Sequence, residues 1–279
     1  MKNILTELSG SESVKSAIKA NWEAYHYCLA QSPNVELSIG RYLTWFITDL
    51  PDHFMNLVVC NQLPPDGIDD LIESALVHFR SMNIRRLSWL TKAGMSSAKI
   101  NEALLAHGLT FRDSFATEMA VDLSLLPDDP PTHPDLRIVP VDDEYALKQW
   151  IHGACIGFRI NEKFEKVWYD FFVGAIFNPQ FRTYLALLDG KPVGTSQLFL
   201  SEGVAGIYNV SCIPEARGQG IGSAITLAPL LEARRMRYRI GILQASQQGY
   251  SVYRRLGFQD FGNLSLHLWE NDSGMNEVQ

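Results

Sequence analysis

The chain alternates between stretches whose apolar residues recur every three or four positions and stretches of strand-favouring residues. The first stripe runs from Ser11 to Leu29, and its spacing predicts a helix. Two strands are expected next, and the turn at 64–67 leads into a second helical stripe. The elements predicted after the first helix, as far as residue 123, are strands over 42–48 and 54–60, a helix over 68–82, a strand over 87–90, a helix over 97–107 and a strand over 114–123.

A second series of elements follows. Asp142 is a candidate N-cap for a helix that runs through Cys155. The pair Asp189-Gly190 between two apolar runs is a strong hairpin signal. The other elements predicted here are a strand over 136–139, a helix over 161–177, strands over 184–188, 193–200 and 207–213, a helix over 222–236, a strand over 241–246, a helix over 248–255 and a strand over 264–269. Pro229 lies inside the helix over 222–236 and predicts a kink near Ile225 or an early helix end.

The same order of elements recurs in both series, at nearly the same spacing along the sequence. The helix starts at Ile68 and Gly222 are 154 residues apart, and Gly108 and Gly257 are 149 residues apart. We therefore expect an internal duplication. Between the series, residues 124–135 hold four prolines and three aspartates without periodicity, which favours an extended connection. The predicted division is a domain over 1–123, a linker over 124–135, a domain over 136–270 and a polar tail over 271–279.

Composition narrows the class of protein. Hydrophobic residues make up 46% of the chain and charged residues 20%, as in soluble globular proteins. The net charge of −7 argues against sequence-independent binding to nucleic acid. With no apolar run of about 18 residues and no secretory signal at the start, neither a membrane span nor export is expected. The four cysteines lack metal-ligand spacing and are expected to be reduced thiols of a cytoplasmic protein.

The stretch from Ile207 to Gly222 reads as a strand, a glycine-containing turn and a helix. The first turn of a helix has free backbone N–H groups and lies at the positive end of the helix dipole, so it favours a phosphate. Glycines in the turn allow the backbone to approach such a ligand closely. Neither the dinucleotide pattern nor the nucleoside-triphosphate pattern is present, so the turn predicts some other phosphate-bearing ligand.

Two motifs resemble the GNAT superfamily of acyl-CoA N-acyltransferases. Arg217-x-x-Gly220-x-Gly222 looks like the loop whose amides bind the pyrophosphate of coenzyme A in that family. Downstream, the segment 246–258 resembles the family's N-x-x-A-x-x-L-Y-x-x-L-G-F. Tyr253 falls on the tyrosine that acts as general acid in many members. Ser246 stands where asparagine is usual and Gly249 where alanine is usual, and both are departures.

The resemblance implies a set of site residues. Tyr253 would protonate the departing thiolate, and backbone N–H groups of the strand would stabilise the oxyanion where it splays from its neighbour. Phe158, Trp168 and Phe172 become candidate substrate contacts, although core packing is the better-supported alternative. The cofactor-binding candidates are Val210, Ser211, Cys212, Arg217, Gly218, Gln219, Gly220, Ile221, Gly222, Ser223 and Ser246.

The general base is left open by the sequence. The chemically able side chains are His152, Glu162, Glu165 and His267, and water is a further carrier of the proton. Cys212 is rejected as a nucleophile because no histidine is spaced to activate it. Arg234 and Arg239 belong to a basic cluster expected mainly to face solvent, with the cofactor's ribose phosphate as the alternative partner.

The predicted fold class is α/β (α+β), with two tandem GNAT-like domains, each a mixed, mostly antiparallel twisted sheet flanked by helices. The first domain is read as degenerate, because Pro64-Pro65-Asp66-Gly67 replaces the glycine loop and Leu104 stands in the place of Tyr253. The leading hypothesis is an N-acetyltransferase that transfers the acetyl group of acetyl-CoA to a primary amine of a small molecule or peptide, without a metal. The alternatives are a non-catalytic acyl-CoA sensor and a structural module. Neither nucleic acid nor membrane is an expected partner, and the chain is expected to be a monomer or homodimer.

Overall fold

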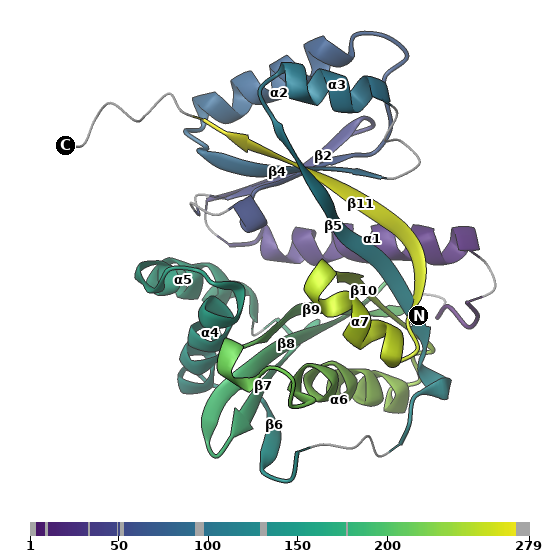
Figure 1. Ribbon diagram of the computed structural model, residues 1–279, viewed down its shortest axis with the longest axis vertical. Helices are drawn as coiled ribbons and strands as arrows, with labels where there is room; N and C mark the ends of the chain where they lie inside the picture. Colours follow the sequence, from purple (N-terminus) through teal and green to yellow (C-terminus); the bar gives the residue numbers. More distant parts are fainter. Residues whose placement is uncertain are drawn as a thin grey trace. The chain divides into compact units, whose positions relative to one another are not determined.

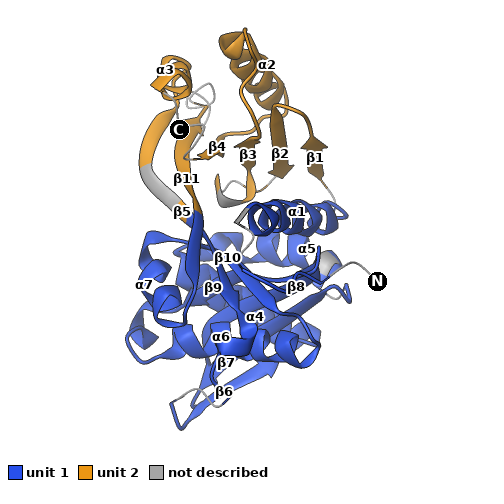
Figure 2. Cartoon of the chain, turned by 90° about the vertical axis from the view of Figure 1, so that its right-hand side faces the viewer, with its two compact units in different colours: residues 1–32, 117–261 blue, residues 33–116, 262–279 orange. Residues whose placement is uncertain are grey.

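The computed structural model describes residues 4–8, 11–32, 34–48, 50, 53–92, 98–128, 133–176 and 178–271. The chain divides into two compact units (Figure 2). Unit 1 comprises residues 1–32 and 117–261, and unit 2 comprises residues 33–116 and 262–279. The helices that the structure describes include none long and apolar enough to cross a membrane.

Unit 1 is built on a mixed sheet in which one neighbouring pair is parallel (Figure 1). The parallel pair is β9 (Val204–Cys212) with β10 (Ile240–Ala245), and the other neighbours are antiparallel. The strand order is β5 (Thr110–Asp122), β10, β9, β8 (Lys191–Ser201), β7 (Phe181–Leu188) and β6 (Leu136–Pro140). β5 enters this unit at residue 117.

Helices cover both faces of this sheet. On one face lie α6 (Ile221–Arg235) and α7 (Gln247–Arg255), whose apolar side chains share a core with alternate residues of the sheet such as Ile207 and Leu243. On the other face lie α1 (Ser11–Leu29), α4 (Glu144–Phe158) and α5 (Glu165–Ile176). The alternation of strand side chains between two faces accounts for this division.

The helix α1 packs so closely on β9 that a Cβ at Gly206 would collide with Asn21. In the same way, a Cβ at Gly157 of α4 would collide with Ser211. Both glycines therefore mark places where a helix and a strand approach each other directly. The face of β9 that carries Gly206 and Ser211 is covered by α1 and α4.

Unit 2 has a smaller sheet of the same kind. Its parallel pair is β3 (Leu57–Cys60) with β4 (Arg86–Lys92), and the strand order is β1 (Val35–Ile39), β2 (Leu43–Thr48), β3, β4 and β11 (Gln259–Glu270). Two helices, α2 (Ile68–Ser81) and α3 (Ala98–Ala106), pack their apolar faces on it around Phe79, Trp89 and Leu104. β11 belongs to this unit from residue 262 onward.

The two units repeat one order of elements: two antiparallel strands, a third strand, a helix, a parallel strand and a helix. The strand that ends each series pairs in the other unit. β5, which ends the first series, pairs with β10 in unit 1, and β11, which ends the second series, pairs with β4 in unit 2. The predicted fold class, an α/β chain with mostly antiparallel sheets, is confirmed. The internal duplication stays a prediction.

The compact units differ from the sequential boundaries that we expected at residues 123 and 136. The helix α1 belongs with the second series of elements, because Val14 and Ile18 pack against Val204 and Ile242. The exchange of β5 and β11 moves the last strand of each series into the other unit. Amphipathic spacing identifies these elements but carries no information about which sheet they join.

Local details also differ. The N-cap of α4 is Asp143 rather than Asp142, and its Oδ1 accepts a hydrogen bond of 2.7 Å from Ala146 N. The edge strand β1 was not predicted, and a short 3-10 turn, Glu162–Phe164, precedes α5.

Pro229 does not end α6, which continues to Arg235. Proline has no N–H, so the carbonyl of Ile225 lacks its usual helical partner. Ser196 Oγ of β8 donates a hydrogen bond of 2.8 Å to that carbonyl in the buried interface. The early end that the sequence suggested is therefore not observed, because a strand hydroxyl supplies the missing donor.

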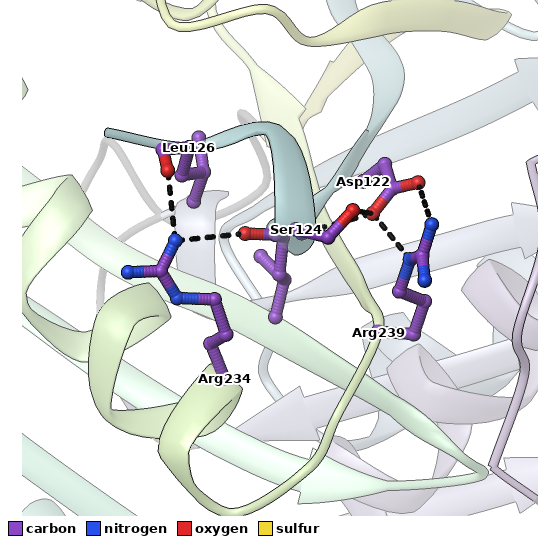
Figure 3. Close-up of polar contacts among 6 residues, drawn as sticks. Asp122, Ser124, Leu126, Arg234 and Arg239 are labelled. Carbon is purple, nitrogen blue, oxygen red and sulfur yellow. Dashed lines mark hydrogen bonds and ion pairs between the residues drawn. The ribbon is translucent and has the colours of Figure 1, made fainter. Parts of the chain in front are cut away.

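The connection after β5 begins with a fixed turn (Figure 3). Asp122 caps the 3-10 turn Leu123–Leu125 and accepts two hydrogen bonds from Arg239, of 2.5 and 2.7 Å. Arg239 thereby holds the pKa of Asp122 below its usual value. Arg234 donates to the Leu126 carbonyl at 2.7 Å. Both arginines thus anchor the start of the connection, and residues 129–132 lie outside the described residues.

Candidate functional site

The parallel strands β9 and β10 separate after a short paired section. Within the described residues they pair at two positions, Ala205 with Gly241 and Gly206 with Ile242. β9 then continues to Cys212 and β10 to Ala245. Residues 207–212 therefore form a strand edge that β10 no longer covers. Backbone groups on such an edge are available to a ligand.

A β-bulge lies on this part of β9. Tyr208 pairs with Gln197 and Ser211 pairs with Thr195, so two residues of β9, Asn209 and Val210, lie opposite Ser196 alone. Asn209 has a φ of +50°, a left-handed conformation that asparagine tolerates better than most residues. A bulge of this kind bends its strand and redirects the neighbouring backbone groups.

The glycine loop connects β9 to α6. Gly218 and Gly220 have φ angles of +77° and +79°, which L-residues with a Cβ rarely adopt. Gly220 is the N-cap of α6 and offers no side-chain cap, and Ala224 N makes the first bond back to the Gly220 carbonyl. A Cβ on either glycine, or on Gly222, would meet no described atom within 4 Å. The loop is thus an open cradle at the start of α6, where free backbone amides can receive an anion such as a phosphate group.

Other loop residues act mainly through their main chain. The side chain of Ile221 is buried in the core, so only its backbone can face a ligand. Gln219 Nε2 donates to the Glu215 carbonyl at 3.2 Å. Ser223 is half-buried on the first turn of α6.

Arg217 holds the loop in place. Its Nε donates to the Cys212 carbonyl at 3.2 Å and its NH2 group donates to the Gly157 carbonyl at 3.1 Å. The guanidinium therefore connects the end of β9 to the C-terminal end of α4. In this conformation the Arg217 guanidinium therefore bonds to main-chain carbonyls, whereas the sequence analysis placed Arg217 among the cofactor-binding candidates.

Tyr253 lies on α7 with its ring in the core beneath the loop. It is 7% exposed, and burial raises its pKa to about 12, partly opposed by a hydrogen bond with Thr226. The phenol consequently keeps its proton at neutral pH. A Cβ at Gly249 would lie 2.9 Å from Tyr253 Cε2, so the ring occupies the space that the family's usual alanine would need.

Ser246 and Cys212 flank this region. Ser246 is the N-cap of α7, and its Oγ accepts a hydrogen bond of 3.2 Å from Gly249 N. Cys212 is half-buried at the end of β9, and burial raises the pKa of its thiol. A raised thiol pKa is unfavourable for a nucleophile, in agreement with the sequence reasoning.

The three aromatic candidates for substrate binding are placed differently from one another. Trp168 and Phe172 are 3% and 0% exposed and pack together between α4 and α5 with Trp150. These two rings belong to the core, the alternative that the sequence favoured. Phe158, at the end of α4, is half-buried and keeps some accessible surface.

The structure does not gather the four candidate bases into one cluster. His152 pairs with Glu165 at 2.8 Å on the exposed side of α4 and α5, and Glu162 is exposed nearby. His267 lies on β11 in unit 2, where burial lowers its pKa. Among the described residues, no group of three or more His, Cys, Asp or Glu side chains is arranged to hold a metal ion.

The contacts of two α1 residues, Tyr25 and Asn21, were not predicted from the sequence, which indicated only a helical stripe over Ser11 to Leu29. Tyr25 and Asn21 reach β9 and bond to Asn209 and Tyr208. The available signal was Asn21 itself, a polar residue at a stripe position seven residues after Val14. A buried amide at such a position needs hydrogen-bond partners.

A cavity of about 370 Å³ lies elsewhere in unit 1, between α6 and the strands β6 and β7. Its wall includes Glu232, which is already paired with Tyr184 at 2.6 Å and with Arg182 at 3.0 Å. The cavity is distinct from the separated strands and the glycine loop.

Comparisons with known proteins agree with this geometry. Residues 179–260 match the family described as "Acetyltransferase (GNAT) domain". This range contains β8, β9, the glycine loop and Tyr253, and the match confirms the resemblance seen in the two motifs. No curated protein matches the sequence.

Solved structures extend the likeness to most of the chain. A GCN5-related N-acetyltransferase from Kribbella flavida has a TM-score of 0.68 at 18% identity, over 94% of this chain and 98% of its own. A GCN5-related N-acetyltransferase from Sphaerobacter thermophilus has a TM-score of 0.56 at 17% identity, over 84% and 82%. A tandem GNAT protein from the clavulanic acid biosynthesis pathway has a TM-score of 0.56 at 16% identity, over 94% and 95%. At these identities the likeness establishes the fold.

Proposed function

Because residues 179–260 are a GNAT acetyltransferase domain within a chain that has the fold of tandem GNAT proteins, we propose that this protein is an N-acetyltransferase. It transfers the acetyl group of acetyl-CoA to a primary amine of a small molecule or peptide. The observation that supports this proposal most directly is the open cradle of Gly218, Gly220 and Gly222. It follows the end of β9, where β9 has separated from β10. The cradle supports diphosphate binding, and the uncovered edge of β9 supports binding of the acyl arm.

In the proposed reaction the amine nitrogen attacks the thioester carbonyl directly. The new C–N bond forms, the C–S bond breaks, and the amine proton leaves through water. Backbone N–H groups between Val210 and Cys212 stabilise the negative charge on the carbonyl oxygen, a contribution of typically about 3 kcal/mol per donor. Tyr253 donates its proton to the departing thiolate and regains one from water, so the phenol is restored after each turnover. Its being protonated at neutral pH supports this role.

The general-acid role is tested with Tyr253→Phe. We expect calorimetry to show unchanged acetyl-CoA affinity, while release of free CoA on a panel of amines falls by roughly 100-fold. Tyr250→Phe on the same helix is the matched control, because that hydroxyl bonds to Asp260 on the surface. Unaltered turnover in Tyr253→Phe would remove the assignment. Acetyl-CoA binding without turnover on any amine would indicate a sensor instead.

The cradle is tested with Gly220→Ala. The added Cβ strains a φ of +79° and enters the space assigned to the diphosphate, so the Kd for acetyl-CoA should rise at least about 10-fold. Gly190→Ala is the control, since Gly190 has a φ of +75° in the β7–β8 hairpin and equally open surroundings. Equal effects of the two substitutions would show that backbone strain, rather than the cradle, explains the loss.

A further inference from the structure

We propose that Tyr25 of α1 is a positioning residue of the acyl-transfer site, acting through the side chain of Asn209 on the β9 bulge. This inference rests on the proposed function. It assigns a part of that site to a helix that precedes the GNAT match by about 150 residues.

Three side chains form a closed hydrogen-bonded triangle beneath α1. Asn209 Nδ2 donates to Tyr25 Oη at 2.9 Å and to Gln197 Oε1 at 3.1 Å. Tyr25 Oη in turn donates to Gln197 Oε1 at 2.9 Å. Gln197 Nε2 donates to Thr183 Oγ1 at 3.2 Å, which fixes the orientation of the glutamine amide. The Asn209 amide nitrogen is therefore held by two acceptors.

Two members of the triangle are buried, and the third, Asn209, is half-buried. Tyr25 and Gln197 are 4% and 0% exposed. The Tyr25 ring stacks on Tyr208 with centroids 3.9 Å apart and meets Phe181 and Phe199 edge-on. Burial raises the pKa of Tyr25, so its hydroxyl keeps the proton that the triangle requires. Buried polar networks that are fully satisfied fix one conformation strongly.

What the triangle fixes is a strained backbone. Asn209 holds a φ of +50° at the bulge, and its carbonyl also accepts a hydrogen bond of 2.8 Å from Thr195 Oγ1. A left-handed non-glycine residue persists when surrounding contacts determine it, and such residues concentrate at functional sites. Here the held residue immediately precedes Val210, the first of the amides proposed to stabilise the oxyanion. Tyr25 thus sets the direction of those amides without touching a substrate.

The first experiment compares Tyr25→Phe with two controls. The variant retains the ring packing and removes only the hydroxyl. We expect kcat for CoA release to fall between roughly 10-fold and 100-fold, with unchanged acetyl-CoA affinity by calorimetry. Tyr27→Phe removes an exposed hydroxyl of α1, and Tyr184→Phe removes a buried hydroxyl that bonds Glu232 at 2.6 Å, away from the separated strands. Both controls should retain kcat within about twofold.

The second experiment acts on the other end of the contact and works even where Tyr25→Phe fails to fold. Asn209→Gly keeps a residue suited to positive φ but loses the amide, whereas Asn209→Ala also strains the backbone. We expect Asn209→Gly to lose as much kcat as Tyr25→Phe, Asn209→Ala to lose more, and the Tyr25→Phe/Asn209→Gly pair to lose no more than Asn209→Gly alone.

The outcomes separate this inference from the proposed function. Full kcat in Tyr25→Phe or in Asn209→Gly, or multiplied losses in the double variant, would overturn the inference while the acetyltransferase function stands. An unaltered protein that neither binds acetyl-CoA nor releases CoA would overturn both. An equal loss of kcat in Tyr184→Phe would show that removing any buried hydroxyl of unit 1 has this effect, and would also overturn the inference.

Discussion

At the scale of single residues, the sequence identified the groups that a motif places by spacing. The glycines of the loop and Tyr253 lie where the motifs put them, because strand, turn and helix follow directly along the chain. The contact between Asn209 and Tyr25 was not predicted, since a bulge adds one residue without any periodic signal and the contact joins positions 184 residues apart. The burial of Trp168 and Phe172 likewise depends on tertiary packing, which the motifs do not describe.

Gly249 is a departure from the family motif with a measurable consequence. Its missing Cβ leaves room for the Tyr253 ring, whose Cε2 would be 2.9 Å from an added methyl group. Gly249→Ala should displace the ring and lower kcat by about 10-fold, with little change in acetyl-CoA affinity. Gly174→Ala, in α5 with open surroundings, is the control and should be neutral or slightly stabilising. Steady-state kinetics and calorimetry check both, and full activity in Gly249→Ala would show that the ring position is not critical.

His26 predicts how stability depends on pH. The ring is 6% exposed, its Nδ1 lies 2.8 Å from the Trp22 carbonyl, and burial lowers its pKa to about 4. In the unfolded chain the pKa is near 6.5. Between these values the unfolded state binds more protons, so His26 stabilises the fold above pH 6.5, and that contribution is lost as the pH falls toward 4.

The loss amounts to at most about 3 kcal/mol in the free energy of unfolding. Urea unfolding at pH 7.5 and pH 5 measures the part of this loss that occurs above pH 5, about 2 kcal/mol. His26→Phe should flatten the difference between the two pH values. An equally steep difference in His26→Phe would assign the effect to other groups.

At the scale of elements, the amphipathic stripes located most helices and strands within a few residues. The errors have local causes that the sequence does not display. The edge strand β1 has four half-buried residues and one exposed residue, so its apolar signal is weak. Pro229 suggested a broken helix, but the compensating donor, Ser196, comes from a strand that lies 33 residues earlier.

The pair Ser196 and Pro229 can be tested through a cycle of substitutions. Ser196→Ala leaves the buried Ile225 carbonyl without a donor and should lower the free energy of unfolding by about 1–3 kcal/mol. With Pro229→Ala the helix regains an N–H at residue 229, so the same serine substitution should cost markedly less. Urea unfolding of the four proteins measures the coupling. Equal costs in both backgrounds would show that the hydroxyl does not replace the helical donor.

At the scale of the whole molecule, the sequence predicted the repeated order of elements but not their assignment to units. Order follows from local periodicity, while strand pairing depends on contacts between distant segments. β5 pairs with β10, and β11 with β4, although each follows a helix of the other series. The same reasoning explains why α1 was assigned to the first domain.

This arrangement determines what happens to a chain shortened to residues 124–279. Such a chain retains the GNAT match but lacks α1 and β5. β10 loses its antiparallel neighbour along six residues, from Ile240 to Ala245. The apolar contacts of Val14 and Ile18 with Val204 and Ile242 are lost as well. Removing the partner of a central strand exposes its backbone hydrogen-bonding groups. Removing a packed helix exposes the apolar surface that it covered.

The shortened chain should therefore not fold cooperatively. Thermal unfolding followed by circular dichroism should show a broad transition, and a dye that binds exposed apolar surface should fluoresce strongly at 25 °C. The full chain, measured alongside, should give a sharp transition and little dye binding. If the sequential boundaries were the structural ones, the shortened chain would instead melt as sharply as the full chain. The outcome thus decides whether the segment with the GNAT match depends on the first 123 residues for its own core.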